Sequence, residues 1–334
     1  MTTSFFGRLA AAAALGLFLA FAPAAGPADA QVNPTASAVK EEQLLRELDK
    51  VTGRATIPDA KAATLIRPDG QTFRYYQKDV YPKVAAVAIL GMIALIAGFF
   101  LYRGRIRIDS GPSGYTIQRF SGLDRFAHWL TAISFLVLAV TGLNTAFGHT
   151  LLSPVLGASA FAAWAQTAKM LHNYTGFAFM AGMLLTFLLW VKDNFLSAAD
   201  IVWLRRFGGL FGHEHPPSER FNFGQKTMFW SVILLGGALS FTGVLMLFPF
   251  VYTDVQGMQT ATLVHGLLGA FFFSAILAHI YIGTLGMEGA FDAMGSGRVD
   301  VNWAKENHSL WAEDELKKQT PQPAPGRPAA APAE

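Results

Sequence analysis

The hydrophobic pattern of the chain is dominated by five long apolar runs separated by polar loops. The runs cover residues 84–102, 126–147, 170–191, 228–251 and 261–287. The shortest would be about 28 Å long as a helix, close to the ~30 Å thickness of a hydrocarbon core. Lipid cannot satisfy exposed backbone groups, so each run is predicted to be a transmembrane helix. A soluble protein with a large buried-helix core would need amphipathic helices to cover that core, and none is visible.

The first thirty residues have the pattern of a secretory signal peptide. Arg8 provides the positively charged start, residues 9–25 form the apolar stretch, and Ala28-Asp29-Ala30 is a small-residue cleavage site. An uncleaved first membrane helix is the alternative interpretation, although the stretch is short and is interrupted by prolines. We expect cleavage after Ala30.

The segments that flank the apolar runs are polar. Residues 31–83 are predicted to be an exported arm, with a short helix at 41–50 and a hairpin-like turn at Pro68-Asp69-Gly70. The arm has too few apolar residues for a substantial core of its own. The C-terminal segment, 311–334, is rich in Pro and Ala towards its end and is predicted to be a disordered tail.

The Lys and Arg residues of the loops predict the orientation. Loops 103–125 and 192–227 contain five each, loop 148–169 contains one, and loop 252–260 contains none. Cytoplasmic loops are enriched in Lys and Arg, so the two basic loops and the tail are expected on the cytoplasmic side of the membrane. The arm has nine cations and breaks this rule, but a signal peptide would export it regardless.

Composition agrees with a membrane location and restricts the chemistry. Charged residues make up 15% of the chain, against roughly 25% in soluble domains. The absence of Cys from the sequence excludes disulfides, thiolate-held iron–sulfur clusters and covalently attached c-type haem. Redox or metal chemistry would therefore depend on His, Met or carboxylates. The net charge of +3 is too small to indicate a nucleic-acid partner.

Four of the eight histidines lie within or at the ends of the apolar runs, where an ionisable residue is costly and indicates function. The predicted topology puts His128 and His279 near the cytoplasmic face, and His172 and His265 near the outer face. His265 and His279 are fourteen residues apart, so they share one helix face with about 21 Å between them. This arrangement suits two cofactors stacked across a bilayer.

A small residue follows each of these histidines one helical turn later, which leaves room for a flat macrocycle. The four small residues are Ala132, Gly176, Gly269 and Gly283. Small residues also serve helix packing in membranes, so the pattern supports a cofactor without requiring one. Neutral imidazole is a good axial ligand for haem iron. Zinc is a weaker alternative, because two histidines provide fewer donors than a zinc site normally has.

With these residues the chain resembles the gamma subunit, a diheme cytochrome b, of membrane-bound respiratory formate dehydrogenase. The matching segments are Arg125-Phe-Ala-His128-Trp129, Lys169-Met-Leu-His172-Asn-Tyr-Thr-Gly176, Phe221-Asn-Phe-Gly-Gln-Lys-Thr-Met-Phe-Trp230 and the His265–His279 spacing. The resemblance covers roughly residues 115–310. It implies an all-α membrane protein, a four-helix transmembrane bundle binding two b haems. The compact four-helix members begin just before the segment matching Arg125, whereas this chain adds a signal, an arm and one extra N-terminal transmembrane helix.

The resemblance also implies the iron ligands. In the family, the inner haem iron binds the residues that match His128 and His279. The outer haem iron binds those that match His172 and His265.

A quinone site is implied as well, for ubiquinone or menaquinone. In the family, quinone lies beside the inner haem, near the positions that match Asn222, Gly224 and Gln225 and near His279. Asn and Gln amides can hydrogen-bond to quinone oxygens, and glycine allows close approach. An ordinary helix N-terminus is the alternative interpretation of residues 222–226.

The function implied by the resemblance is electron transfer. An exported catalytic subunit with molybdenum or tungsten would oxidise formate, and an iron–sulfur subunit would pass electrons to this chain, which would reduce quinone at the cytoplasmic side. The expected organisation is a signal at 1–30, an arm at 31–83, an extra helix at 84–102, a diheme cytochrome b domain at 103–310 and the tail at 311–334. The alternatives are the cytochrome b subunit of a hydrogenase or thiosulfate reductase type complex, and a non-redox membrane assembly or transport protein whose histidines only pack.

Overall fold

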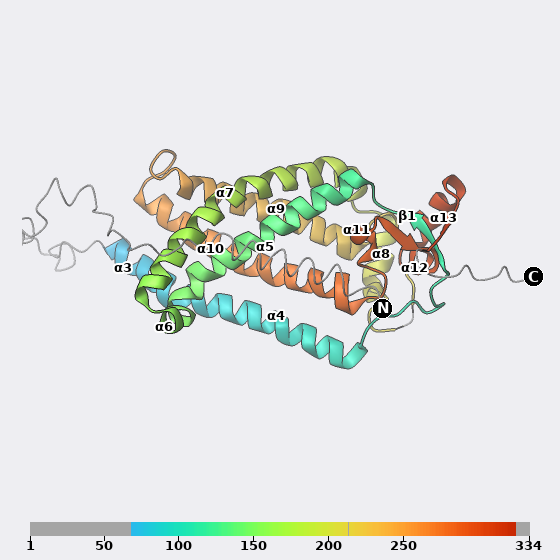
Figure 1. The fold of residues 1–334 in the computed structure, drawn as a ribbon, viewed down its shortest axis with the longest axis horizontal. Coiled ribbons are helices and arrows are strands. Elements are labelled where there is room, and N and C mark those ends of the chain that lie inside the picture. Colours follow the sequence, from blue (N-terminus) through green and yellow to red (C-terminus); the bar gives the residue numbers. More distant parts are fainter. Residues whose placement is uncertain (1–67, 213, 325–334) are drawn as a thin grey trace, which may run out of the picture. The chain divides into compact units, whose positions relative to one another are not determined.

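The computed structural model describes residues 68–212 and 214–324 of the chain (Figure 1). The predictions for the signal at 1–30, for the arm before residue 68 with its helix at 41–50, and for residues 325–334 lie outside the described residues. Within the described part, five helices are long and apolar enough to cross a membrane, which confirms the five predicted spans.

The spans are built from nine helical segments. The first span is formed by α3 (Pro68–Tyr75), the π-helical turn η1 (Tyr76–Val80) and α4 (Tyr81–Arg103). The others are α5 (Gly122–Leu151), α7 (Ala158–Trp190) with the 3-10 turn η2 (Val191–Asp193), α9 (Phe223–Leu247), and α10 (Val255–Tyr281) with the π-helical turn η4 (Ile282–Gly286). Between the spans lie three short helices, α6 (Ser153–Leu156), α8 (Ala198–Arg205) and η3 (Phe207–Gly209).

The helices differ from the apolar runs mainly at their ends. α7 begins at Ala158 rather than at residue 170, because its alanine-rich first part packs on the equally extended end of α5. The indole Nε1 of Trp164 donates to Asn144 Oδ1 across this contact at 2.8 Å. The hairpin-like turn predicted at residues 68–70 is wrong: they open α3, where Pro and Asp suit the first turn of a helix. The predicted extra helix at 84–102 lies within a longer helix, whose candidate membrane span runs from Thr72 to Arg103.

Helix α10 is the centre of the bundle. It packs against α9, against α5 and against the extra helix α4, while α5 pairs with α7 along most of its length. Two glycines allow the closest approaches: a Cβ at Gly266 of α10 would lie 2.9 Å from the Tyr81 ring of α4, and a Cβ at Gly182 of α7 would lie 2.8 Å from the Thr131 backbone nitrogen of α5. Small residues serve membrane helix packing in this way.

One end of the bundle is covered by a structure that we call the cap, residues 104–121 and 287–324. Its elements are β1 (Tyr115–Gln118), α11 (Asp292–Gly295), β2 (Arg298–Asp300), α12 (Val301–Asn307), α13 (Ser309–Lys318) and β3 (Gln322–Pro323). The strands form an antiparallel sheet in the order β2-β1-β3. The all-α bundle is thus confirmed, but the sheet was not predicted. The disorder predicted from residue 311 is wrong for 311–324, because α13 and β3 pack there.

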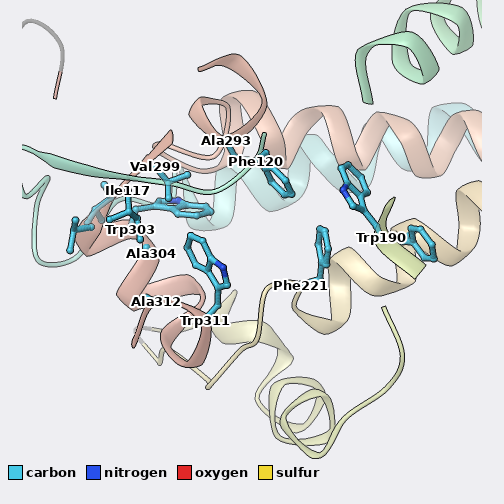
Figure 2. Packing of buried hydrophobic residues seen from close by; sticks show 13 residues of the cluster. Ile117, Phe120, Trp190, Phe221, Ala293, Val299, Trp303, Ala304, Trp311 and Ala312 are labelled. Carbon is cyan, nitrogen blue, oxygen red and sulfur yellow. The ribbon is translucent and has the colours of Figure 1, made fainter. Parts of the chain in front are cut away.

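The cap has its own apolar core, which continues into the bundle. Figure 2 shows Ile117 and Val299, paired across β1 and β2, beside the indoles of Trp303 and Trp311. Phe120, Phe221 and Trp190 extend this cluster to the ends of α7 and α9. We call the end of the bundle with the cap the cap end, and the end with α3 and α6 the far end (Figure 1).

A buried arginine and histidine join the cap to the loop before α9. Arg119 Nη2 donates to Arg220 O at 2.6 Å and to His308 Nε2 at 3.0 Å, and its guanidinium lies 4.7 Å from the Trp311 ring centre. His308 Nδ1 donates to Glu219 O at 2.9 Å, so the ring is neutral with its proton on Nδ1. Burial, and then the charge of Arg119, hold the pKa of His308 well below its usual value. Burial, followed by Arg220, lowers the pKa of Arg119 to about 9.

The depressed pKa of His308 predicts a loss of cap stability at acidic pH. The unfolded chain takes up a proton on this residue near pH 6.5, whereas the folded cap does not, so its contribution is complete above that pH. Below it, the free energy of unfolding falls by up to about 1.4 kcal/mol per pH unit. The check is the melting temperature of the detergent-solubilised protein, followed by tryptophan fluorescence between pH 7.5 and 5.5. His308→Gln keeps an acceptor for Arg119 without a titrating group and should flatten the acid slope. An equal slope in both proteins would contradict the assignment.

Candidate functional site

Two pairs of histidine rings face each other between the spans. His128 of α5 and His279 of α10 have ring centroids 6.3 Å apart, with the ring planes at 58°. His172 of α7 and His265 of α10 have centroids 6.1 Å apart, at 65°. The structure therefore brings together the same two pairs that the predicted depths suggested. The first pair lies towards the cap end and the second towards the far end.

One continuous helix supplies a histidine to both pairs. α10 has no break between residues 255 and 281, so His265 and His279 are separated by about 21 Å of helix rise. His128, near the start of α5, and His172, midway along α7, come from neighbouring helices to meet them. The other histidines are elsewhere: His149 packs on Phe161, His215 Nε2 lies 3.2 Å from Asp109 Oδ2, and His308 belongs to the cap. His213 lies outside the described residues.

The ring separations fit a metal ion held between two imidazoles. A metal–imidazole bond is about 2 Å long, and two such bonds plus the distance from each nitrogen to its ring centre give a little over 6 Å. Among the described residues no group of three or more His, Cys, Asp or Glu could hold a metal ion. Zinc prefers three or four protein donors, whereas haem iron needs only two axial ligands because the porphyrin fills the remaining positions. The donor set therefore fits haem better than zinc.

Hydroxyl groups fix the tautomer of the far-end pair. Thr141 Oγ1 lies 2.7 Å from His172 Nδ1, and Thr242 Oγ1 lies 2.9 Å from His265 Nδ1. Both hydroxyls donate their own proton to a backbone carbonyl of the preceding turn, at 2.8 Å in each case. With their protons directed in this way, the threonine oxygens accept from the rings. Each ring also hydrogen-bonds a backbone group, that of Leu138 for His172 and that of Leu239 for His265. This arrangement leaves each Nε2 unprotonated and able to bind iron. Sequence reasoning missed both threonines, although each stands in a Thr-Gly step in the middle of an apolar run.

Glycines leave space beside the rings. A Cβ at Gly142 would lie 3.7 Å from His172 Cε1, and a Cβ at Gly243 would lie 3.4 Å from His265 Cε1. Of the small residues noted one turn after the histidines, Gly176 and Gly283 face open space, with nothing within 4 Å of an added Cβ. Gly269 instead faces Leu239 at 3.9 Å, so it also serves helix packing. The surroundings of the pairs thus have room for a flat group.

The cap-end pair has a different environment. His128 Nδ1 is buried, and no hydrogen-bond partner for it is found among the described residues. The neighbouring Trp129 lies edge-on to the His128 ring at 5.3 Å and donates from its Nε1 to Met294 O of the cap at 2.9 Å. Arg125 also donates to Met294 O, at 3.2 Å. The start of α5 is therefore held by the cap, and this contact sets the position of His128.

Of the four residues predicted for the quinone site, His279 lies in α10, and Asn222, Gly224 and Gln225 lie at the start of α9, at the cap end. Asn222 and Gln225 form a reciprocal capping box: Asn222 Oδ1 accepts from Gln225 N at 3.0 Å, and Gln225 Oε1 accepts from Asn222 N at 3.2 Å. Both amide oxygens are thus occupied, while the two NH2 groups have no hydrogen-bond partner in the described part of the chain. They remain available as donors.

Gly224 has a structural neighbour. A Cβ at this position would lie 3.2 Å from the Trp203 ring of α8, so the missing side chain allows α8 to approach α9. Sequence reasoning missed Trp203, and it also treated Lys226 as a loop cation. Lys226 is 1% exposed and donates to Asp200 at 2.7 Å and to Glu219 at 3.1 Å. A buried charge of this kind needs its partners, so this ion cluster fixes the start of α9.

Comparison with known proteins agrees with this arrangement. Residues 119–297 match the model of the prokaryotic cytochrome b561 family. The nitrate-inducible formate dehydrogenase cytochrome b556(Fdn) subunit of Escherichia coli K12 is 30% identical over 215 residues, which are 61% of this chain and 95% of the relative. The cytochrome b556(fdo) subunit of the same strain is 29% identical over 209 residues, with the same coverage. The formate dehydrogenase cytochrome b556 subunit of Haemophilus influenzae is 29% identical over 198 residues, covering 58% of this chain and 80% of the relative.

The matched region spans both histidine pairs, both Thr-Gly steps and the start of α9. The family descriptions support haem b as the cofactor, and the five apolar helices support a multi-pass membrane protein. The chain belongs to the prokaryotic cytochrome b561 family, as a membrane cytochrome b of the formate dehydrogenase cytochrome b subunit type.

Proposed function

We propose that this chain conducts electrons across a bacterial inner membrane from exported formate dehydrogenase subunits to quinone, using two b haems that are each held by two histidines. The observation that carries the proposal is the presence of two imidazole pairs, with centroids 6.1 and 6.3 Å apart, at opposite ends of one bundle. His172 and His265 would hold the far-end iron, and His128 and His279 the cap-end iron. When bound, haem b supplies reversible one-electron chemistry.

The partners follow from the chemistry that the chain lacks. Without Cys it has no ligands for iron–sulfur clusters, so a separate iron–sulfur subunit would deliver electrons to it. The relatives are named as formate dehydrogenase subunits, which supports a catalytic formate dehydrogenase subunit as the source of those electrons. We infer that this partner is exported and contains molybdenum or tungsten. Formate oxidation itself would take place on that partner.

The orientation rests on charge. Residues 103–125, around the loop between α4 and α5, and residues 192–227, around the loop between α7 and α9, contain five Lys or Arg each, and both loops lie at the cap end. The positive-inside rule then makes the cap cytoplasmic and the far end periplasmic. Electrons would enter beside His172 and His265 and leave beside His279. Inward movement of an electron, with protons taken from the cytoplasm, stores about 2.3 kcal/mol per charge per 100 mV of membrane potential.

At the cap end, the chain would bind quinone at the first turn of α9, close to the pair that includes His279. The free NH2 groups of Asn222 and Gln225 can donate hydrogen bonds to a quinone oxygen, while their oxygens keep the helix capped. The helix N-terminus also favours negative charge, which develops on a quinone oxygen as it is reduced. Gly224 acts indirectly, by letting Trp203 close against this turn.

Paired alanine substitutions test the two haem sites. Both histidines of a pair are needed to hold one iron. The double variant His172→Ala with His265→Ala should therefore lose one haem, and each of the two single variants should lose the same one. His172→Ala with His279→Ala should lose both. The measurement is haem per purified chain, from the pyridine haemochrome assay, together with the reduced-minus-oxidised b-type spectrum.

His149→Ala, which changes a histidine outside both pairs, is the matched control and should keep two haems. Retention of a haem by the cross-pair double variant would contradict the pairing. A colourless wild-type protein would overturn the proposed function and favour a non-redox membrane protein.

Gln225→Glu tests the quinone site without removing the helix cap. A glutamate can accept the hydrogen bond from Asn222 N as Gln225 does, but it lacks the NH2 donor. Both haems should remain, and turnover with a soluble quinone analogue should fall by about threefold to tenfold, the effect of one hydrogen bond. Formate oxidation by the assembled complex with an artificial acceptor should be unchanged.

Ser121→Ala removes a cap of the same kind from the neighbouring helix α5 and controls for general loosening of the cap end. If the Gln225→Glu and Ser121→Ala variants lose quinone turnover equally, or if neither does, Gln225 does not bind quinone.

A further inference from the structure

The two histidine pairs differ in what holds the back of their rings. In the far-end pair, each Nδ1 meets a threonine hydroxyl of a neighbouring helix, Thr141 of α5 for His172 and Thr242 of α9 for His265. In the cap-end pair, His128 Nδ1 has no hydrogen-bond partner among the described residues. Both rings of the far-end pair are thus held by a hydrogen bond at Nδ1, whereas the His128 ring is not.

The two threonine contacts are built alike. Each threonine is buried, with 3% exposure for Thr141 and 7% for Thr242. Each hydroxyl donates to the carbonyl four residues earlier, Val137 O and Ala238 O. Each threonine is followed by a glycine over which the Cε1 edge of the same ring lies. Two different helices, α5 and α9, therefore present the same Thr-Gly step to the two histidines of one pair. This repetition indicates that the step serves the histidine pair rather than helix packing alone.

The direction of these hydrogen bonds determines their chemical effect. Because each hydroxyl proton is already directed to a carbonyl, the threonine oxygen accepts Nδ1–H from the ring. An imidazole that donates from Nδ1 is a more basic ligand through Nε2. A more basic ligand stabilises the higher oxidation state of iron, and second-shell hydrogen bonding is one of the ways in which a protein sets a haem potential. Burial in a medium of low dielectric strengthens the effect.

We infer that Thr141 and Thr242 are positioning residues that fix the tautomer of His172 and His265 and lower the reduction potential at the far-end haem site relative to the cap-end site. The inference rests on the proposed function and deepens it. A lower potential at the far end makes transfer towards the cap end favourable, so the asymmetry of the hydrogen bonds gives the bundle a preferred direction of electron flow.

The test is a spectroelectrochemical redox titration of the purified holoprotein, which resolves the midpoint potentials of two b haems. Thr141→Val and Thr242→Val replace the hydroxyl with a methyl group of similar size. Each should shift one midpoint potential upwards, the same one in both cases, and leave the other unchanged. The double variant should shift it further.

Three further variants separate the effect of the hydroxyl from that of a changed side-chain shape. Thr141→Ser and Thr242→Ser keep the acceptor oxygen and should restore the wild-type potential. Thr167→Val, on the exposed side of α7, removes a hydroxyl that donates only to Ala163 O at 3.0 Å and should change neither potential.

The outcomes distinguish this inference from the proposed function. Loss of one haem in the valine variants with recovery in the serine variants would also support it, because the hydroxyl would then be needed to hold the ligand. Two haems with unshifted potentials in the valine variants would overturn the inference and leave the proposed function intact. Equal shifts in valine and serine variants would overturn it too. A wild-type protein without two haems would instead contradict the proposed function.

Discussion

Helix α10 has to present two imidazoles on one face, fourteen residues apart, and the positions of the other helices follow from that constraint. α7 brings His172 to His265 at the far end, and α5 brings His128 to His279 at the cap end. α9 lies along α10 and supplies the threonine behind His265, while the extra helix α4 packs on α10 where Gly266 admits the Tyr81 ring. α5, α7 and α9 thus pack on the side of α10 that carries the histidine pairs or contribute a residue to them, whereas α4 only covers the helix.

The parts of this arrangement that could be predicted from the sequence are those on which lipid imposes a strict rule. Backbone groups in hydrocarbon must be satisfied by helix, so apolar length alone gave the five spans. An ionisable side chain at membrane depth is costly, so the histidines were recognisable, and helical geometry placed His265 and His279 on one face. The small residues after the histidines were informative only in part, since Gly176 and Gly283 face open space but Gly269 packs against Leu239.

The parts that were missed depend on contacts between distant segments in water. β1 has four residues and β3 has two, too few for a recognisable alternation, and Arg298 Nε donates to Thr116 Oγ1 from 182 residues away. Arg119 and Lys226 were counted only as loop cations, yet one is enclosed by indoles and the other by carboxylates. The threonines behind His172 and His265 were hidden for another reason: Thr in a membrane helix normally bonds its own preceding turn, and nothing in the local sequence distinguishes one that also meets a histidine.

The cap joins one segment that is synthesised before the last four spans to another that is synthesised after them. β1 precedes α5, whereas its partners β2 and β3 follow α10, so the sheet cannot form until the last four spans have been threaded through the membrane. During biogenesis the backbone groups of β1 therefore lack their partners in β2 and β3 until those strands have been synthesised. Closing the sheet brings together residues as far apart as Thr116 and Gln322, which are 206 positions apart in the sequence, and contacts of such long range slow folding. The same closure brings Met294 to Arg125 and Trp129, beside His128. The cap can therefore complete its fold only after membrane insertion, and its closure then sets the final position of His128 in one of the two histidine pairs.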